Sequence, residues 1–152
     1  EEVADYYVNN FKMNITGIRL PIIIGPGLNY RGVAAGISDM AYATKIEAQC
    51  IIKAPASALD VIYIKDAANI FIKIINSKTI LKNIYNCASI RTNTLKLANN
   101  FNKLSKKKYI KINNISNGAT YPIMDYNKLK RDINFSLKYT SSKLIKDWLT
   151  NI

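Results

Sequence analysis

The fold class is indicated first by the sequence IRLPIIIGPG (residues 18–27). Its run of β-branched apolar residues predicts a buried strand within residues 14–26, and its glycine-proline-glycine end is a signal for a turn. The preceding segment, EEVADYYVNNF (residues 1–11), carries Val3, Tyr7 and Phe11 at spacings of four, which is typical of an amphipathic helix. A helix, a short turn and a buried strand in series indicate an α/β protein with a parallel sheet.

The same alternation continues towards the C-terminus. Hydrophobic periodicity and turn residues separate the elements. Asp66 stands near the start of one expected helix, where a carboxylate suits a helix N-terminus, and Thr92 or Thr94 is expected to cap another. Strands or short apolar segments are expected at 50–53, 59–64, 84–88 and 109–112, and helices at 33–48, 67–75, 95–104, 125–131 and 141–149.

The charge of the chain is unevenly distributed. The 152 residues, enough for one domain, carry 22 Lys and Arg against 10 Asp and Glu, a net charge of +12. Residues 1–60 hold five basic and six acidic groups, whereas residues 61–152 hold seventeen basic and four acidic groups. Such asymmetry raises nucleic acid or an acidic membrane as a partner. Most of these bases are lysines at expected exposed helical positions, which favours a solvated surface, so we expect neither a nucleic-acid nor a membrane partner.

Composition excludes several classes of site. The chain has no histidine and no Cys-x-x-Cys, which argues against a zinc site and against a nucleophile paired with histidine. There is no glycine-rich dinucleotide turn and no P-loop. No apolar run is long enough to span a membrane. Two isolated cysteines, Cys50 and Cys87, fit a reducing compartment, so a cytoplasmic location is expected.

Two places hold candidate ligand-binding residues. The glycine-flanked loop that follows the first strand contains Asn29 and Arg31, and α/β folds bind ligands at the carboxyl ends of parallel strands. By position alone, an ordinary connecting loop is an equally good interpretation of this segment. Asp60 and Asp66 stand six residues apart across a predicted strand end and raise the idea of a carboxylate pair for acid–base chemistry, although Asp66 is better explained as a helix cap.

Five segments, taken in order, resemble sequence patterns of one enzyme family. IRLPIIIGPG is similar to the R-x-P-x-x-x-G-P-G strand and loop of the extended short-chain dehydrogenase/reductases, also called NAD-dependent epimerase/dehydratases. The other four segments are LDVIYIKDAANIF (59–71), NIYNCAS (83–89), RTNTLKLANNF (91–101) and DYNKLKRDINFSLKYTSSKLIKDWL (125–149). Together they cover almost the whole chain.

The resemblance implies the C-terminal half of such an enzyme: the C-terminal part of a Rossmann-type parallel sheet plus a small α/β substrate domain. Residues 1–32 would be the last helix, strand and ligand loop of the nucleotide-binding domain. Residues 33–152 would be mostly substrate-binding domain, with a strand at 83–88 returning to the main sheet. The family's catalytic Tyr-x-x-x-Lys and glycine-rich turn would lie upstream of Glu1, so no catalytic residue is expected here.

The resemblance also implies a function and a set of contacts. The intact protein would be an NAD(P)-dependent oxidoreductase or epimerase that transfers hydride on a hydroxyl or carbonyl substrate, with NAD or NADP as cofactor. It would form a homodimer through the helix that ends at Phe11. The implied cofactor-binding residues are Leu20, Pro21, Ile22 and Ile23, and the implied substrate-binding residues are Asn29, Arg31, Asp60 and Tyr63.

Two departures from the family pattern bear on the substrate. Members that act on nucleotide sugars commonly have Asn where Ile22 stands, and a phosphate-binding Arg where Leu59 stands. Without those anchors a buried phosphate would be poorly satisfied, which favours a smaller hydroxy or carbonyl compound unless Arg31 substitutes. Two other interpretations stay open: a basic nucleic-acid-binding module, and a non-catalytic structural paralogue.

Overall fold

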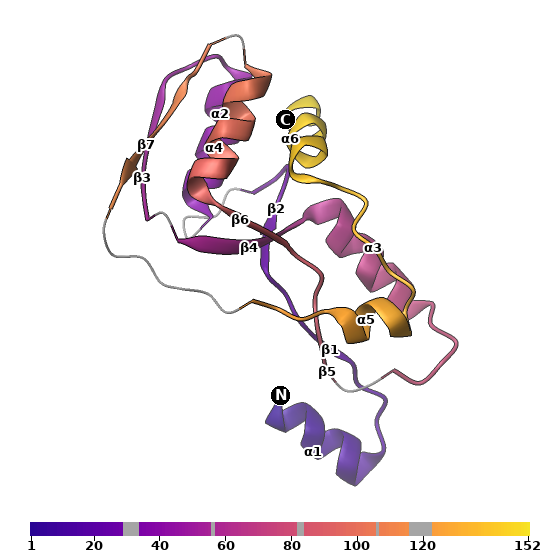
Figure 1. Cartoon of the computed structure of the whole chain (residues 1–152). Helices are drawn as coiled ribbons and strands as arrows, with labels where there is room; N and C mark the ends of the chain where they lie inside the picture. Colours follow the sequence, from indigo (N-terminus) through magenta and orange to yellow (C-terminus); the bar gives the residue numbers. More distant parts are fainter. Residues whose placement is uncertain (29–33, 56, 82–83, 106, 116–122) are drawn as a thin grey trace.

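The computed structural model describes residues 1–28, 34–55, 57–81, 84–105, 107–115 and 123–152. Helices and strands alternate along it (Figure 1). The helices are α1 (Glu2–Phe11), α2 (Ala35–Lys45), α3 (Ile64–Ile75), α4 (Thr94–Leu104), α5 (Asn127–Asp132) and α6 (Ser141–Thr150). The strands are β1 (Gly17–Arg19), β2 (Ile22–Ile24), β3 (Cys50–Ala54), β4 (Ala58–Tyr63), β5 (Ile84–Asn86), β6 (Ile90–Asn93) and β7 (Ile110–Asn114).

The strands form three small sheets. β1 pairs with β5, and β3 pairs with β7, both in parallel. In the third sheet β4 lies between β2, which is parallel to it, and β6, which is antiparallel. The expected α/β class with parallel pairing is therefore confirmed, with one antiparallel strand added.

The strand expected within residues 14–26 is divided in two. Leu20 and Pro21 separate β1 from β2, and Pro21 has no N–H to donate to a neighbouring strand. Because of this interruption the two pieces take different partners: Arg19 lies opposite Asn86, and Ile24 lies opposite Tyr63. The break brings the end of β2 against the start of α3.

Two predicted helix caps are wrong. Neither Thr92 nor Thr94 caps α4; instead Asn93 is the N-cap residue, and its side-chain oxygen accepts from the Lys96 N–H at 2.7 Å. Asp66 lies in the first turn of α3, but its buried carboxylate accepts the N–H groups of Lys138 and Tyr139, each at 3.1 Å. Local sequence favours a cap at Asp66, whereas the fold uses the carboxylate to hold the segment before α6.

The two faces of β4 belong to two different hydrophobic cores. Leu59, Val61 and Tyr63 point into a core with α2, α4 and α6, whereas Ile62 points into a second core with α3, α5 and β5. This follows from the alternation of side chains along a strand. β4 therefore lies between the two cores and contributes side chains to both.

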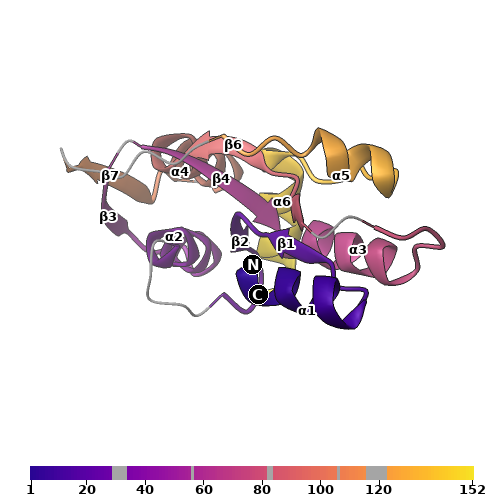
Figure 2. The same cartoon turned by 90° about the horizontal axis from the view of Figure 1, so that it is seen from below.

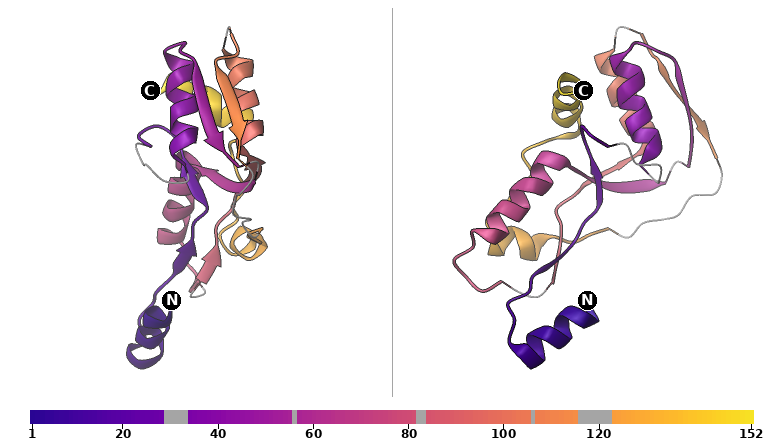
Figure 3. Two further views of the ribbon diagram at one scale, coloured as in Figure 1. Left: turned by 90° about the vertical axis from the view of Figure 1, so that its left-hand side faces the viewer. Right: turned by 180° about the vertical axis from the view of Figure 1, so that it is seen from behind.

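Helix α1 stands apart from both cores. It extends from the end of the molecule (Figure 3), and none of its residues is buried. Val3, Tyr6 and Phe11 are all exposed. Within the described segments, no helix is both long and apolar enough to cross a membrane.

Candidate functional site

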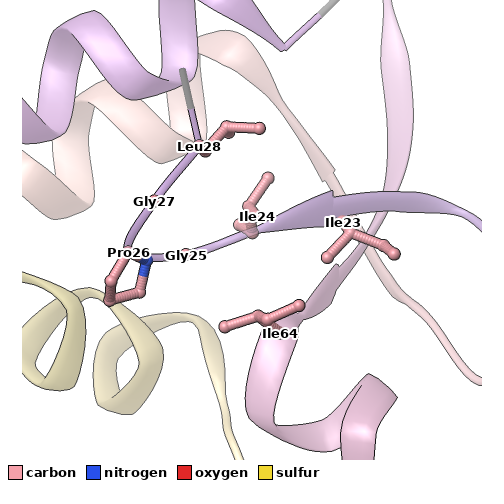
Figure 4. A pocket seen from close by; sticks show the side chains of 7 residues that line it. All are labelled: Ile23, Ile24, Gly25, Pro26, Gly27, Leu28 and Ile64. Carbon is pink, nitrogen blue, oxygen red and sulfur yellow. The ribbon is translucent and has the colours of Figure 1, made fainter. Parts of the chain in front are cut away.

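A small apolar cavity lies where β2 ends (Figure 4). Its volume is about 160 Å³, and none of its lining side chains is charged. Strand end, loop and the first residue of α3 all contribute to the lining, which consists of Ile23, Ile24, Gly25, Pro26, Gly27, Leu28 and Ile64. The cavity thus occupies the carboxyl end of a parallel strand, the place where α/β folds bind ligands.

Gly25 allows the tight turn that follows β2. Its φ is +150°, a conformation that residues with a side chain rarely adopt. A Cβ atom here would lie 2.5 Å from Cγ2 of Ile64 and 3.1 Å from Cε2 of Tyr63. The turn closes with a hydrogen bond from the Leu28 N–H to the Gly25 carbonyl at 3.3 Å. Only glycine lets the loop lie this close to the start of α3.

The four residues proposed for the cofactor do not all meet in this cavity. Ile23 lines it. Leu20 is exposed, Pro21 is half-buried between the two strands, and Ile22 packs against the first core. Their side chains alternate along the strand, so the structure brings one of the four to the cavity.

Asp60 is buried and has two partners. Its carboxylate lies 3.3 Å from Nη1 of Arg91, directly opposite it in β6, and accepts from the Met124 N–H at 3.3 Å. The carboxylate thereby ties β4 to β6 and to the segment before α5. Asn29 and Arg31, the other two polar candidates, lie outside the described residues.

Tyr63 is fully buried and holds α6 in place. Its hydroxyl donates to Oδ2 of Asp147 at 2.5 Å, and Nζ of Lys65 lies 2.7 Å from the same oxygen. Burial, and then the bond to Asp147, raises the pKa of the Tyr63 phenol. The bonds from Lys65 and Tyr63 lower the pKa of Asp147. The structure gives Tyr63 no open surface for a substrate; its ring instead supports the loop at Gly25.

Two Tyr-x-x-x-Lys spacings occur in the chain, although the resemblance places the family's catalytic motif upstream of Glu1. They are Tyr126 with Lys130 and Tyr139 with Lys143. The ring of Tyr139 packs at a tilt against that of Tyr63, with centroids 4.6 Å apart, and Nζ of Lys143 lies 4.9 Å from the centroid of the Tyr139 ring. None of these four residues lines the cavity at the end of β2. Tyr139 and Lys143 instead pack around Tyr63.

Sequence reasoning missed three residues around this site: Ile64, Arg91 and Asp147. Ile64 closes the cavity, and the other two supply partners to Asp60 and Tyr63. The Tyr63–Asp147 bond joins residues 84 positions apart, so no local pattern could reveal it. In the part of the chain that the structure describes, no three His, Cys, Asp or Glu side chains are grouped to hold a metal ion.

Comparison with known sequences finds no matching family model and no matching curated protein. Solved structures do match. L-threonine 3-dehydrogenase from Trypanosoma brucei superposes with a TM-score of 0.86 at 17% identity, over 99% of this chain and 50% of that one. UDP-N-acetylglucosamine 4-epimerase from Bacillus cereus gives 0.80 at 18% identity, over 98% and 49%.

A third match, dTDP-glucose 4,6-dehydratase from Bacillus anthracis in complex with NAD, gives a TM-score of 0.77 at 14% identity, over 99% and 48%. The chain therefore spans about half the length of the solved structures it matches. At these identities the likeness concerns the fold. The chain has the α/β fold of the C-terminal part of the Rossmann-type extended short-chain dehydrogenases and epimerases.

Proposed function

We propose that this chain is the C-terminal portion of an NAD(P)-dependent oxidoreductase or epimerase that acts by hydride transfer on a hydroxyl or carbonyl substrate. The observation that carries the proposal is the superposition of nearly the whole chain on half of each matched enzyme. One of those enzymes was solved with NAD bound.

The cavity at the end of β2 fits the nicotinamide end of such a cofactor. It is small, apolar and free of charged side chains, and Gly25 and Gly27 present backbone where a side chain would fill the space. Within the described segments, none of its lining residues could hold a phosphate. Ile23, Leu28 and Ile64 would therefore pack against the ring and exclude water, while the dinucleotide phosphates would need groups outside this cavity. NAD(P), when bound, would accept or donate the hydride.

The substrate is proposed to be a small hydroxy or carbonyl compound. Leu59 is buried in the first core, so no cation stands where nucleotide-sugar enzymes commonly carry their phosphate-binding arginine. Arg91, which lies opposite Asp60 in the neighbouring strand, is paired with that carboxylate. Neither Leu59 nor Arg91 therefore offers an anionic sugar nucleotide the bidentate partner that a buried phosphate needs, and Arg31, the substitute that the sequence raises, lies outside the described residues.

Saturation-transfer NMR with NADH tests the cofactor assignment, because it detects weak binding to the chain itself. We expect saturation on the nicotinamide protons, lost in Gly25→Ala and kept in Tyr42→Ala, which alters an exposed residue of α2. Saturation confined to the adenine protons, or none, would contradict the proposal. Residues 1–152 alone should not reduce NAD with any hydroxy compound, and turnover by this chain would refute its assignment as the non-catalytic half.

We further propose that the intact protein is a cytoplasmic homodimer that pairs through α1. Val3, Tyr7 and Phe11 lie on one side of this helix and are exposed, with the rings of Tyr7 and Phe11 5.4 Å apart. Exposed aromatic groups of this kind are common in protein interfaces. Tyr7→Glu should convert a dimer to a monomer in analytical ultracentrifugation, whereas Tyr42→Glu should not.

A further inference from the structure

Helix α5 carries a polar cavity that the proposed function does not use. Its volume is about 500 Å³, and four exposed side chains line it: Asn127, Lys130, Arg131 and Asn134. None of them lines the cavity at the end of β2. Figure 2 shows α5 at the end of the molecule opposite β3 and β7. We call this second cavity the α5 pocket.

The sequence of α5 places three of the four side chains on one face of the helix. Asn127, Lys130 and Arg131 are separated by three and four positions, so they fall within about 100° of the helix circumference. Leu129, on the opposite face, is buried in the second core. Burial of Leu129 therefore fixes which side of α5 turns its polar groups outwards.

Asn134 joins the pocket because the chain turns back directly after α5. Its φ is 47°, in the left-handed region that asparagine tolerates better than most residues. The Phe135 N–H then donates to the Lys130 carbonyl at 3.2 Å, which closes the helix end. Nζ of Lys73 donates to the carbonyls of Ile133 and Asn134, at 3.3 and 2.8 Å. Main-chain oxygens that would repel an anion at this end are thereby bonded to the protein.

The pocket offers positive charge and hydrogen-bond donors. In the part of the chain that the structure describes, neither Lys130 nor Arg131 forms an ion pair with a carboxylate. The acidic residues of the segment are bonded elsewhere: Asp132 accepts the Tyr85 hydroxyl at 2.7 Å, and Asp125 accepts a backbone N–H at the start of α5 at 2.9 Å. An ammonium, a guanidinium and two side-chain amides therefore remain available to a ligand that accepts hydrogen bonds.

We propose that the α5 pocket binds the phosphate group of a small molecule, at a site separate from the cofactor cavity. The guanidinium of Arg131 would hold two phosphate oxygens in a bidentate contact, and the ammonium of Lys130 would add a second charge. The amides of Asn127 and Asn134 would donate to the remaining oxygens. The pocket is larger than a phosphate ion, so it has room for the group that the phosphate is attached to.

A nucleic acid is the competing ligand. A long polyanion is bound by cations that follow its backbone. The other lysines of α3 and α5 are instead turned to acceptors in the protein: Lys65 to Asp147, Lys73 to the helix-end carbonyls, and Lys128 to the Ile84 carbonyl at 3.2 Å. In the described residues of these two helices the unpaired charge is thus confined to one place, which favours a compact phosphate compound.

Isothermal titration calorimetry of the natural protein with inorganic pyrophosphate tests the site, with NADH in excess to fill any dinucleotide site. Lys130→Gln/Arg131→Gln should weaken pyrophosphate binding about tenfold or more, because it removes two charge-assisted contacts. Lys107→Gln/Lys108→Gln is the matched control: it removes two charges from another exposed pair and should leave the affinity nearly unchanged. Arg131→Lys keeps the charge without the planar fork, so it should weaken binding by less than the double change.

Three results of this titration would overturn the proposal. They are no binding of pyrophosphate at millimolar concentration, an equal loss of affinity in the two double variants, and preferential binding of a short single-stranded oligonucleotide over pyrophosphate. The inference and the proposed function can fail separately. Lys130→Gln/Arg131→Gln should keep the saturation of the nicotinamide protons, and its loss there would place the α5 pocket in the cofactor site and refute this inference. Pyrophosphate binding in a protein that does not bind NADH would refute the proposed function alone.

Discussion

Tyr63, the last residue of β4, donates its hydroxyl to Asp147 of α6 at 2.5 Å. The same tyrosine ring lies against Gly25, at the start of the loop that forms the cavity. One side chain therefore joins the C-terminal helix to the candidate cofactor loop. Lys65 completes the contact from the first turn of α3.

Tyr63→Phe should lower the free energy of unfolding by about 1–2 kcal/mol, because it removes a hydrogen bond to a charged acceptor and keeps the ring packing. Urea denaturation, followed by the fluorescence of Trp148 in α6, measures the change. In a double-mutant cycle with Asp147→Ala the two effects should not add, since each change removes the hydrogen bond between these two residues. Tyr42→Phe at the surface is the control. Strict additivity would show that the bond does not stabilise α6.

Acid should loosen α6. The folded pKa of Asp147 lies below its ordinary value of 3.8, chiefly because Lys65 and then Tyr63 donate hydrogen bonds to the carboxylate. A group with a lowered folded pKa stabilises the fold above its ordinary pKa, and the contribution is lost as pH falls through the lowered value. The melting temperatures of the wild type and Asp147→Asn should therefore differ most near neutral pH and converge as pH drops below about 4. A difference that stays constant as the pH falls further below about 4 would contradict the assignment.

Gly25→Ala should destabilise the loop by about 1–3 kcal/mol through backbone strain and steric overlap. The new methyl group would lie 2.5 Å from Cγ2 of Ile64. Adding Ile64→Ala should restore part of the loss, because it removes the overlapping atom and leaves the strain at φ +150°. Gly27→Ala is the comparison: its φ is +83°, but a Cβ atom there meets nothing within 4 Å. Equal losses at the two glycines would show that contact with Ile64 is unimportant.

The two cysteines should react with thiol reagents at very different rates. Cys87 is fully buried, and burial raises the pKa of its thiol to about 12. Cys50 is half-buried, and its pKa is also raised, mainly by burial. Because the thiolate is the reactive form, Cys50 should react slowly in the folded chain and Cys87 only after unfolding. Titration with Ellman's reagent, with Cys50→Ser as the control, counts the accessible thiols; rapid reaction of both would contradict this packing.

Local sequence was a good guide to the elements and a poor guide to their partners. The strand at 59–64 was expected from its apolar run, and β4 covers Ala58–Tyr63. The antiparallel strand β6 was missed, because IRTN (residues 90–93) has little alternation and is held by pairing with β4. The resemblance implies a substrate contact for Asp60. In the structure its carboxylate pairs with Arg91, which the same strand pairing places opposite it.

By itself the sequence determined the α/β class, the order of the elements and the likeness to half of a Rossmann-type enzyme. The class and the order of the elements depend on hydrophobic periodicity and turn residues, which act over a few neighbouring positions, whereas the likeness rests on five ordered sequence segments. The three-dimensional contacts were needed to show that Pro21 splits one strand between two sheets, that Asp66 and Tyr63 secure the C-terminal segment, and that one apolar face of α3 is exposed in the described part of the chain. Each of those outcomes depends on atoms that are distant in the chain, and their contacts exist only once the backbone has brought them within bonding distance.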